Sequence, residues 1–457
     1  MRLVVTFFLL AGLVANIVSW HSVEPVVIGL MFYAIGLGLV LFLPAPRDNL
    51  RFFSITYSIY WATTGLSSLY LNFGNDISLR FGDAQNFFLL ATGAEGAFPL
   101  NEIYDVSEGA LAIKIWHYVY EFASALSFSI EPYIGLTVNS SILALVSVLS
   151  LHLLRKVSPH NPNSERLLLI LFAFCPMFWL SASIHLRDSF TALLTVINYY
   201  VLIQFMTRKF NLFWQSAAVA VSIVFPFIFH FLRTEFFFIP IALFAAAIIS
   251  MIVFKSEKRG GGNLKYVFVF LFALFLVLSA DNLGFIPLDY IDKGREDYEI
   301  KALGTNVENS LGYKFVVDQP LYIRSVVGLP YLFLMPIPLW AGIGLGSVSM
   351  FFKTLFAIFN FFFLPYLAIA VGGFMHLSGQ QRVRIYFLLA SSAVLTVTVA
   401  ISSLESRHII PFLPPLFIAC AAMAEYVMTR AKGLRLFTQI LLLMMLMVHA
   451  AWLLLKG

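Results

Sequence analysis

The chain has 457 residues, of which 60% are hydrophobic and 12% are charged. Its mean hydropathy of +0.88 excludes an ordinary soluble domain and a disordered chain. The net charge is +5, but the basic residues stand singly between apolar runs, so we expect no nucleic-acid partner. The composition predicts an all-α polytopic membrane protein.

Apolar runs long enough to cross a bilayer recur along the chain. A spanning helix needs about 20 apolar residues. The first run follows a single Arg and lacks a clear small-residue cleavage site, so we expect a retained helix and not a removed signal peptide. Thirteen runs predict spans, near 3–20, 25–44, 52–72, 131–154, 167–185, 189–206, 211–231, 236–254, 266–284, 351–376, 385–402, 409–428 and 436–455.

Two further apolar stretches are predicted not to cross the membrane. Residues 109–130 are amphipathic, because Lys114, His117 and Glu121 interrupt the apolar face, and we expect a helix lying on the membrane surface. Residues 326–345 carry three prolines, which predicts a re-entrant or interfacial element.

The distribution of basic residues fixes the predicted orientation. With a cytoplasmic N-terminus, the inner segments hold 17 of the 29 basic residues and only four of the 24 acidic ones. That bias follows the positive-inside rule, and making only one of the two stretches a span inverts everything after it. We expect one integral membrane domain over 1–457, with two sizeable outer loops at 73–130 and 285–350.

Titratable groups gather at four predicted outer helix ends. Each group combines an Arg with at least one acid, and three of them add a His, whereas the inner ends carry Lys and Arg almost without acids. This asymmetry is the strongest functional signal in the sequence. The members are Asp76, Arg80 and Asp83; His185, Arg187 and Asp188; His230, Arg233 and Glu235; and Glu405, Arg407 and His408.

Several arginines at one membrane depth suit a phosphate-containing ligand. The guanidinium fork donates two hydrogen bonds and stays charged. Taken singly, each arginine also fits simple snorkelling to lipid headgroups, and Asp83 is placed to cap a helix beginning at "DAQNFFLLA". No metal-ligand spacing or nucleotide motif occurs, so we expect neither a metal nor a cofactor, although Asp76 and Asp83 leave a divalent ion open.

The order of four motifs resembles a known class of enzymes. "FGDAQNFFLLA", "SASIHLRDSF", "HFLRTEFF" and "SRHIIPFLPP" follow one another as in bacterial polytopic proteins of surface-polysaccharide assembly. These are the GT-C type glycosyltransferases that use lipid carriers and the Wzy-type repeat-unit polymerases. The resemblance implies a GT-C-like fold in the bacterial inner membrane, with a site facing the periplasm.

The resemblance also implies a substrate and residue roles. The donor is a glycan on undecaprenyl phosphate or diphosphate, and a chain-length regulator is a further partner. Asp83 and His408 are the expected catalytic residues, with their order as base left open. The resemblance implies that Arg187, Arg233 and Arg407 bind the carrier phosphate. With the other members of the four helix-end clusters, the expected substrate-binding residues are Arg80, His185, Arg187, Asp188, His230, Arg233, Glu235, Glu405 and Arg407.

The spans before the acidic loop favour one branch of this class. Additional spans precede the loop, which departs from the GT-C pattern and favours a polymerase of O-antigen or exopolysaccharide units. Three alternatives stay open: a transferase that moves one sugar from a polyprenyl phosphate, a flippase for lipid-linked oligosaccharides, and a non-enzymatic scaffold.

Overall fold

The fold is known from a computed structural model that describes most of the chain. In the described residues every regular element is a helix, as the composition predicts. Asp76, Arg80 and the predicted span 266–284 lie outside the described residues, as do 73–81 and 95–108 of the first predicted loop and most of the second. The described ranges are 2–72, 82–94, 109–158, 160–207, 211–253, 316, 319–336, 339–343, 348–377 and 379–456.

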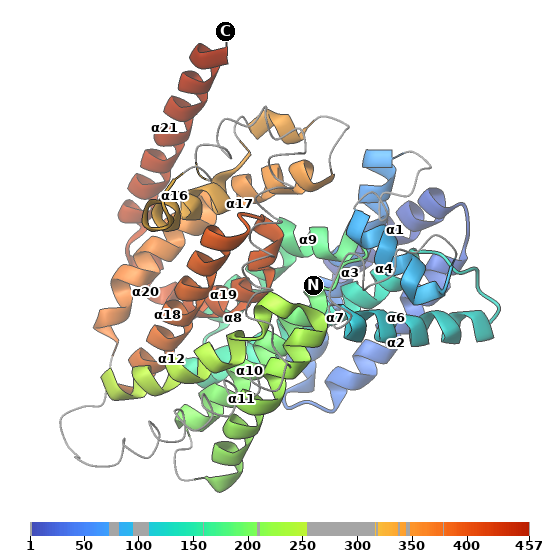
Figure 1. Cartoon of the computed structure of the whole chain (residues 1–457), viewed down its shortest axis with the longest axis horizontal. Coiled ribbons are helices and arrows are strands. Elements are labelled where there is room, and N and C mark those ends of the chain that lie inside the picture. Colours follow the sequence, from blue (N-terminus) through green and yellow to red (C-terminus); the bar gives the residue numbers. More distant parts are fainter. Residues whose placement is uncertain are drawn as a thin grey trace.

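Figure 1 shows the described helices in chain order. Short 3₁₀ helices interrupt the order at Thr234–Phe236 (η2), Leu339–Gly342 (η4), Phe374–His376 (η5) and Ser406–Phe412 (η6). The α-helices are α1 (Arg2–Trp20), α2 (Glu24–Leu41), α3 (Pro46–Asn72), α4 (Gly82–Thr92), α6 (Ala110–Ala125), α7 (Tyr133–Val157), α8 (Pro162–Phe174), α9 (Pro176–Ser183), α10 (Asp188–Thr207), α11 (Leu212–Leu232), α12 (Ile239–Val253), α16 (Leu321–Leu334), α17 (Val348–Gly373), α18 (Gly379–Ser402), α19 (Leu413–Ala422), α20 (Ala424–Thr429) and α21 (Ala431–Lys456).

Nine helices of the described chain are long and apolar enough to cross a membrane, and a bent pair makes up to ten. The pair is α8 and α9, which meet at an angle of 47°. The sequence predicts one span there, over 167–185. The helix breaks because Cys175 precedes Pro176 and takes an extended conformation, as residues before proline prefer.

Two other predicted spans differ from the structure. The run 52–72 forms the helix α3, which starts at Pro46 and is too polar to count among the apolar spans. The run 409–428 is not one helix, because it divides into η6, α19 and α20. Three prolines at 411, 414 and 415 account for the irregular start, since each removes a backbone donor.

The two stretches predicted not to span also form helices. Residues 109–130 contain α6, which buries Trp116 and Tyr120 on one face and exposes Tyr118 and Phe122 on the other. The amphipathic helix is therefore present. Most of the Pro-rich stretch is helical too, because α16 runs through Pro330 and ends at Leu334, before η4.

The helix α7 forms the centre of the molecule and packs against α2, α3, α10 and α19 (Figure 1). Within the most apolar 18 residues of α7, 83% of the residues are buried. By contrast, only 17% and 11% of the residues in the corresponding stretches of α1 and α21 are buried, and α21 projects from one edge of the bundle. The peripheral helices therefore leave wide apolar faces for lipid.

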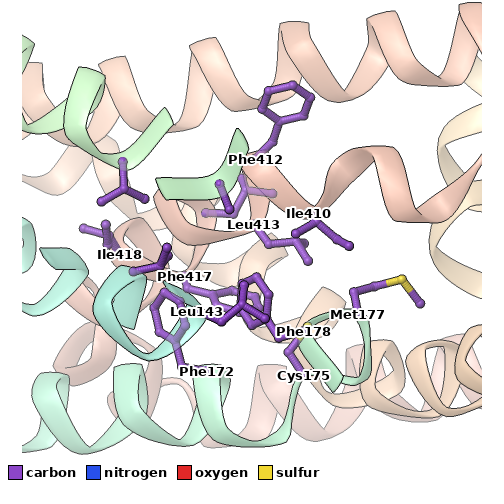
Figure 2. Close-up of a cluster of buried hydrophobic side chains, with 14 of the residues drawn as sticks. Leu143, Phe172, Cys175, Met177, Phe178, Ile410, Phe412, Leu413, Phe417 and Ile418 are labelled. Atoms are coloured by element: carbon purple, nitrogen blue, oxygen red, sulfur yellow. The ribbon is translucent and has the colours of Figure 1, made fainter. Parts of the chain in front are cut away.

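Aromatic rings fill the core beside α7 (Figure 2). The rings of Phe172 and Phe178 stack with centroids 5.2 Å apart, and Phe417 meets both edge-on. These rings come from α8, α9 and α19, so they join the bent pair to the C-terminal half of the chain. Ring pairs of this kind stabilise a core by about 0.5–1.5 kcal/mol each beyond the area that they bury.

The two ends of α7 carry different surroundings. Gly135 lies against the ring of His185, whereas Arg155 forms ion pairs with Asp48 and Glu165. Twenty residues of helix separate Gly135 from Arg155, which corresponds to about 30 Å at 1.5 Å per residue. We call these two regions the Gly135 end and the Arg155 end.

Candidate functional site

Charged side chains from several helix ends meet at the Gly135 end. The guanidinium of Arg233 donates to Asp188 Oδ1 at 3.3 Å and lies 2.5 Å from His408 Nε2. Its Nε lies 3.5 Å from Glu235 Oε2. Arg233 therefore joins Asp188 and His408, which are far apart in the sequence, to its near neighbour Glu235.

A second ion pair adds the first acidic motif to this network. Arg407 Nη2 donates to Asp83 Oδ2 at 3.1 Å, across 324 positions of the chain. Asp83 is the second residue of α4, where a carboxylate interacts favourably with the helix dipole. All four predicted clusters thus supply at least one member to a single network.

The network residues stand where helices start or stop. Asp188 is the first residue of α10. Arg233 is the residue after α11, where the backbone turns extended with φ −161° and ψ 114°. Because α10 begins and α11 ends at the network, the side chains of Asp188 and Arg233 can both reach its centre.

The segment 403–408 brings in the last members through a tight turn. Leu404 has a φ of 51°, in the left-handed region that non-glycine residues rarely adopt. The Glu405 N–H donates to Ser403 Oγ at 3.4 Å, and the His408 N–H donates to the Glu405 carbonyl at 3.0 Å. This fold places Glu405, Arg407 and His408 on one turn of chain.

Burial divides the network into two layers. The side chains of Arg233 and Asp188 are only 4% and 3% exposed, and His408 is buried with them. Asp83 and Glu235 are 37% and 32% exposed. We call Asp188, Arg233 and His408 the buried layer. The partly exposed layer consists of Asp83, Glu235, Lys353 and Glu405, together with Arg407, whose side chain is only 11% exposed but which pairs with Asp83.

Lys353 belongs to the site although sequence reasoning missed it. It lies near the start of α17, with its Nζ 3.0 Å from Glu405 Oε1. The available signal is a lone lysine inside the apolar run "SMFFKTLFAIF". A charged side chain within a membrane span costs free energy, so such a residue usually has a functional role.

His185 and Arg187 lie beside the network. The His185 ring is fully buried, 4.0 Å from the Trp116 ring, and its Nε2 lies 3.0 Å from Tyr120 Oη. The burial lowers the pKa of His185 to about 3, so the ring is neutral. Arg187 stacks on the ring of Phe87 at 5.2 Å. This geometry gives His185 a packing role.

His230 packs against aromatic rings. Its ring is buried and meets Phe237 at a centroid distance of 6.4 Å, close to edge-on. The sequence places it with Arg233 and Glu235, three to five positions away, and the structure turns its ring toward phenylalanines. Arg80, the remaining predicted binding residue, lies outside the described residues.

Asn139 is a second residue that sequence reasoning missed. It is fully buried on α7, and its Nδ2 donates to the carbonyls of residues 181, 184 and 186, at 3.3, 3.3 and 3.1 Å. Its Oδ1 accepts from Ser189 Oγ at 2.9 Å. One side-chain amide therefore hydrogen-bonds the backbone carbonyls where the chain between α9 and α10 is not helical, and it holds Arg187 and Asp188 in position.

The surrounding cations shift the titration of two groups. Burial raises the pKa of Glu405, but Lys353 and Arg407 outweigh it, so the pKa stays below the ordinary value. The pKa of His408 lies well below its ordinary value, first because of burial and then because of Arg233 and Arg407. At neutral pH the network therefore holds a carboxylate at Glu405 and a neutral ring at His408.

Comparison with protein-family models and with curated proteins gives no match. The fold and the spans decide the class. The chain is a polytopic, all-helical membrane protein. Among the residues that the structure describes, no three His, Cys, Asp or Glu side chains gather closely enough to hold a metal ion.

Proposed function

We propose that this membrane protein binds the phosphate or diphosphate of a lipid-linked glycan at the Gly135 end and transfers the glycan to an acceptor hydroxyl. One observation carries the proposal: Arg233, Arg407 and Lys353 reach one network of carboxylates from separate helix ends. Burying charged groups there costs several kcal/mol per ion. An anionic ligand at membrane depth explains why the chain retains them.

The partly exposed layer is the side that meets the ligand. Arg407 and Lys353 each bind a carboxylate and have geometry suited to exchanging it for phosphate oxygens. Arg233 is more deeply buried and holds the layer in place through Asp188 and Glu235. Its charge adds to the positive potential that favours an anion.

Asp83 is the proposed general base. It is the most exposed carboxylate among the ion pairs of the network and lies at hydrogen-bond distance from Arg407. It takes the proton of the acceptor hydroxyl as that oxygen bonds to the anomeric carbon. The bond from the anomeric carbon to the carrier phosphate breaks, and Arg407 and Lys353 stabilise the phosphate that leaves.

The resemblance of the sequence motifs supports the finer assignment. It favours a carrier of the undecaprenyl type, a site on the periplasmic side of a bacterial inner membrane and polymerisation of O-antigen or exopolysaccharide units. Transfer of a single sugar from a polyprenyl phosphate uses the same residues and is the second candidate. A chain-length regulator is the expected protein partner of a polymerase.

Binding to the purified chain in lipid nanodiscs tests the proposal. Undecaprenyl diphosphate is expected to bind more tightly than phosphatidylglycerol. Arg407→Ala and Lys353→Ala are each expected to weaken binding about tenfold or more, because a hydrogen bond to a charged group contributes about 1.5–3 kcal/mol. Arg155→Ala, at the other end of α7, is the matched control and leaves binding unchanged. Equal binding of both lipids, or an equal effect of all three variants, contradicts the proposal.

A second assay separates transfer from transport. The chain in proteoliposomes receives an undecaprenyl-diphosphate-linked oligosaccharide, and the products are separated by length. Longer glycans that disappear with Asp83→Asn indicate transfer. Movement of the headgroup between leaflets without longer glycans indicates a flippase, a class in which broken helices such as α8 and α9 are common.

A further inference from the structure

We propose that His408 is a positioning residue that holds Arg233, and that it is not the proton acceptor of the reaction. Its link to a ligand rests on the proposed function, whereas its hydrogen-bonding state is a property of the protein alone. The proposal narrows the two expected catalytic residues, Asp83 and His408, to Asp83.

The contact with Arg233 fixes the tautomer of the ring. Arg233 Nη2 lies 2.5 Å from His408 Nε2. A guanidinium has only donors, so the imidazole nitrogen facing it must offer its lone pair. The ring proton of a neutral His408 is therefore on Nδ1.

The other side of the ring agrees with this assignment. His408 Nδ1 lies 2.7 Å from Ser403 Oγ, a hydroxyl oxygen that accepts from an N–H. Both ring nitrogens are thus engaged by groups of matching polarity. A general base must present a lone pair to the proton that it removes, and here that lone pair is directed at Arg233.

The surroundings disfavour a second proton on the ring. His408 is buried, and the cations Arg233, Arg407, Arg187 and Lys353 act on it. Two carboxylates of the network, Asp188 and Glu405, are themselves bound to Arg233 and Lys353. The ring therefore acts as a fixed, neutral acceptor.

The ring also joins two parts of the chain. Through Nδ1 it holds the turn at Ser403, which carries Glu405 and Arg407, and through Nε2 it holds Arg233 at the end of α11. Arg233 in turn donates to Asp188. A change at His408 therefore reaches the ligand-facing residues without contact between the ring and the ligand.

Nitrogen NMR of the wild-type chain tests the hydrogen-bonding state directly. The full chain is labelled with ¹⁵N-histidine, and His408→Gln identifies the resonances of His408. We expect one neutral ring with its proton on Nδ1 and no titration between pH 5 and pH 8. A proton on Nε2, or a midpoint within that range, overturns the proposal.

A pair of variants tests the role in the network. The amide oxygen of His408→Gln can accept from Arg233, whereas His408→Leu offers no acceptor. With undecaprenyl-diphosphate-linked oligosaccharide as the probe, we expect His408→Gln to retain at least a third of kcat with an unchanged pH profile. We expect His408→Leu to lose more than tenfold. The proposal is overturned if both variants lose nearly all of kcat to the same extent and if the limb of the pH profile that reports the base disappears.

The two proposals fail in different ways. If the wild-type chain neither binds nor converts the lipid-linked probe, the proposed function is wrong, and the NMR measurement still decides the state of His408. If the probe is converted and His408 titrates with the rate, the positioning role is wrong while the proposed function stands.

Discussion

The Gly135 end and the Arg155 end both carry ion pairs, but they place them in different environments. At the Gly135 end, Arg233 and Asp188 are each at most 4% exposed. At the Arg155 end, Arg155 bridges Asp48 at 2.5 Å and Glu165 at 2.7 Å, and Asp48 is 44% exposed. The pairs at the Arg155 end are the shorter ones and are more exposed than the Arg233–Asp188 pair, since the side chains of Arg155 and Glu165 are 19% and 13% exposed.

The difference shows that the N–O distance of an ion pair does not determine how much the pair contributes to stability. A solvent-exposed pair contributes about 0.2–1 kcal/mol and is screened by salt. A buried pair gives little net stability, yet removing one partner costs about 3–5 kcal/mol because a charge is left without compensation. The ion pairs at the Arg155 end therefore fit a structural role. The buried charges at the Gly135 end lower stability, and a ligand-binding function would explain why they are there.

The largest expected effect is at the centre of the buried layer. Asp188→Ala is expected to lower the free energy of unfolding by about 3–5 kcal/mol, because Arg233 keeps its charge in a buried position. The double variant Asp188→Leu/Arg233→Met is expected to recover part of that loss. Denaturant unfolding in mild detergent measures both. A single variant as stable as wild type would place Arg233 in water.

The next largest effect concerns the break between α9 and α10. Asn139→Leu removes the amide donor from the carbonyls of residues 181, 184 and 186, although the Ile184 carbonyl still accepts from the Leu186 N–H. Each buried group left without a donor costs about 1–3 kcal/mol. We expect a total loss of roughly 2–3 kcal/mol, since the backbone relaxes in part. Ser140→Ala is the matched control, because among the described residues Ser140 Oγ donates to the Leu136 carbonyl of its own helix and to no other helix. Equal stability of the two variants would argue against the bracing role.

A smaller effect is expected where α7 touches His185. A Cβ at Gly135 would lie 2.3 Å from two atoms of the His185 ring, so Gly135→Ala forces the ring to move. Overpacking of this kind costs about 1–3 kcal/mol. Gly38→Ala, a helical glycine with nothing within 4 Å of the added Cβ, serves as control and is expected to stabilise by about 0.5–1 kcal/mol. The two melting temperatures should shift in opposite directions.

The smallest effect is expected at the Arg155 end. Arg155→Ala is expected to cost about 1 kcal/mol or less, and the cost should shrink in high salt. Thermal unfolding at two salt concentrations checks this. A loss as large as that of Asp188→Ala, independent of salt, would remove the contrast between the two ends.

The sequence predicts the helices better than it predicts their breaks. Apolar length locates nearly all the described spans, because burial in lipid requires it. The bend at Cys175–Pro176 was missed, although Pro176 was visible, since apolar length alone does not distinguish a continuous span from a broken one. The division of 409–428 by its prolines was missed for the same reason.

The site was partly predictable from composition and chain position. Arginines and acids at successive helix ends indicated Asp83, Asp188, Arg233 and Arg407. Lys353 and Asn139 were not found, because their partners lie 52 and more than 40 positions away, and only the fold brings them together. His185 and His230 share the helix-end pattern but point to aromatic rings, a matter of side-chain direction that spacing does not reveal.

The length of α7 has a consequence for the membrane around the protein. This helix holds the His185 contact near one terminus and the Arg155 clamp near the other, and its buried flanks prevent it from tilting alone. The bilayer must therefore adapt to the protein, since thinner or thicker hydrocarbon cannot be matched by a change in α7. The loosely packed α1 and α21 are the helices free to follow the lipid. The chain should accordingly favour bilayers of one thickness and lose activity in bilayers that deviate from it.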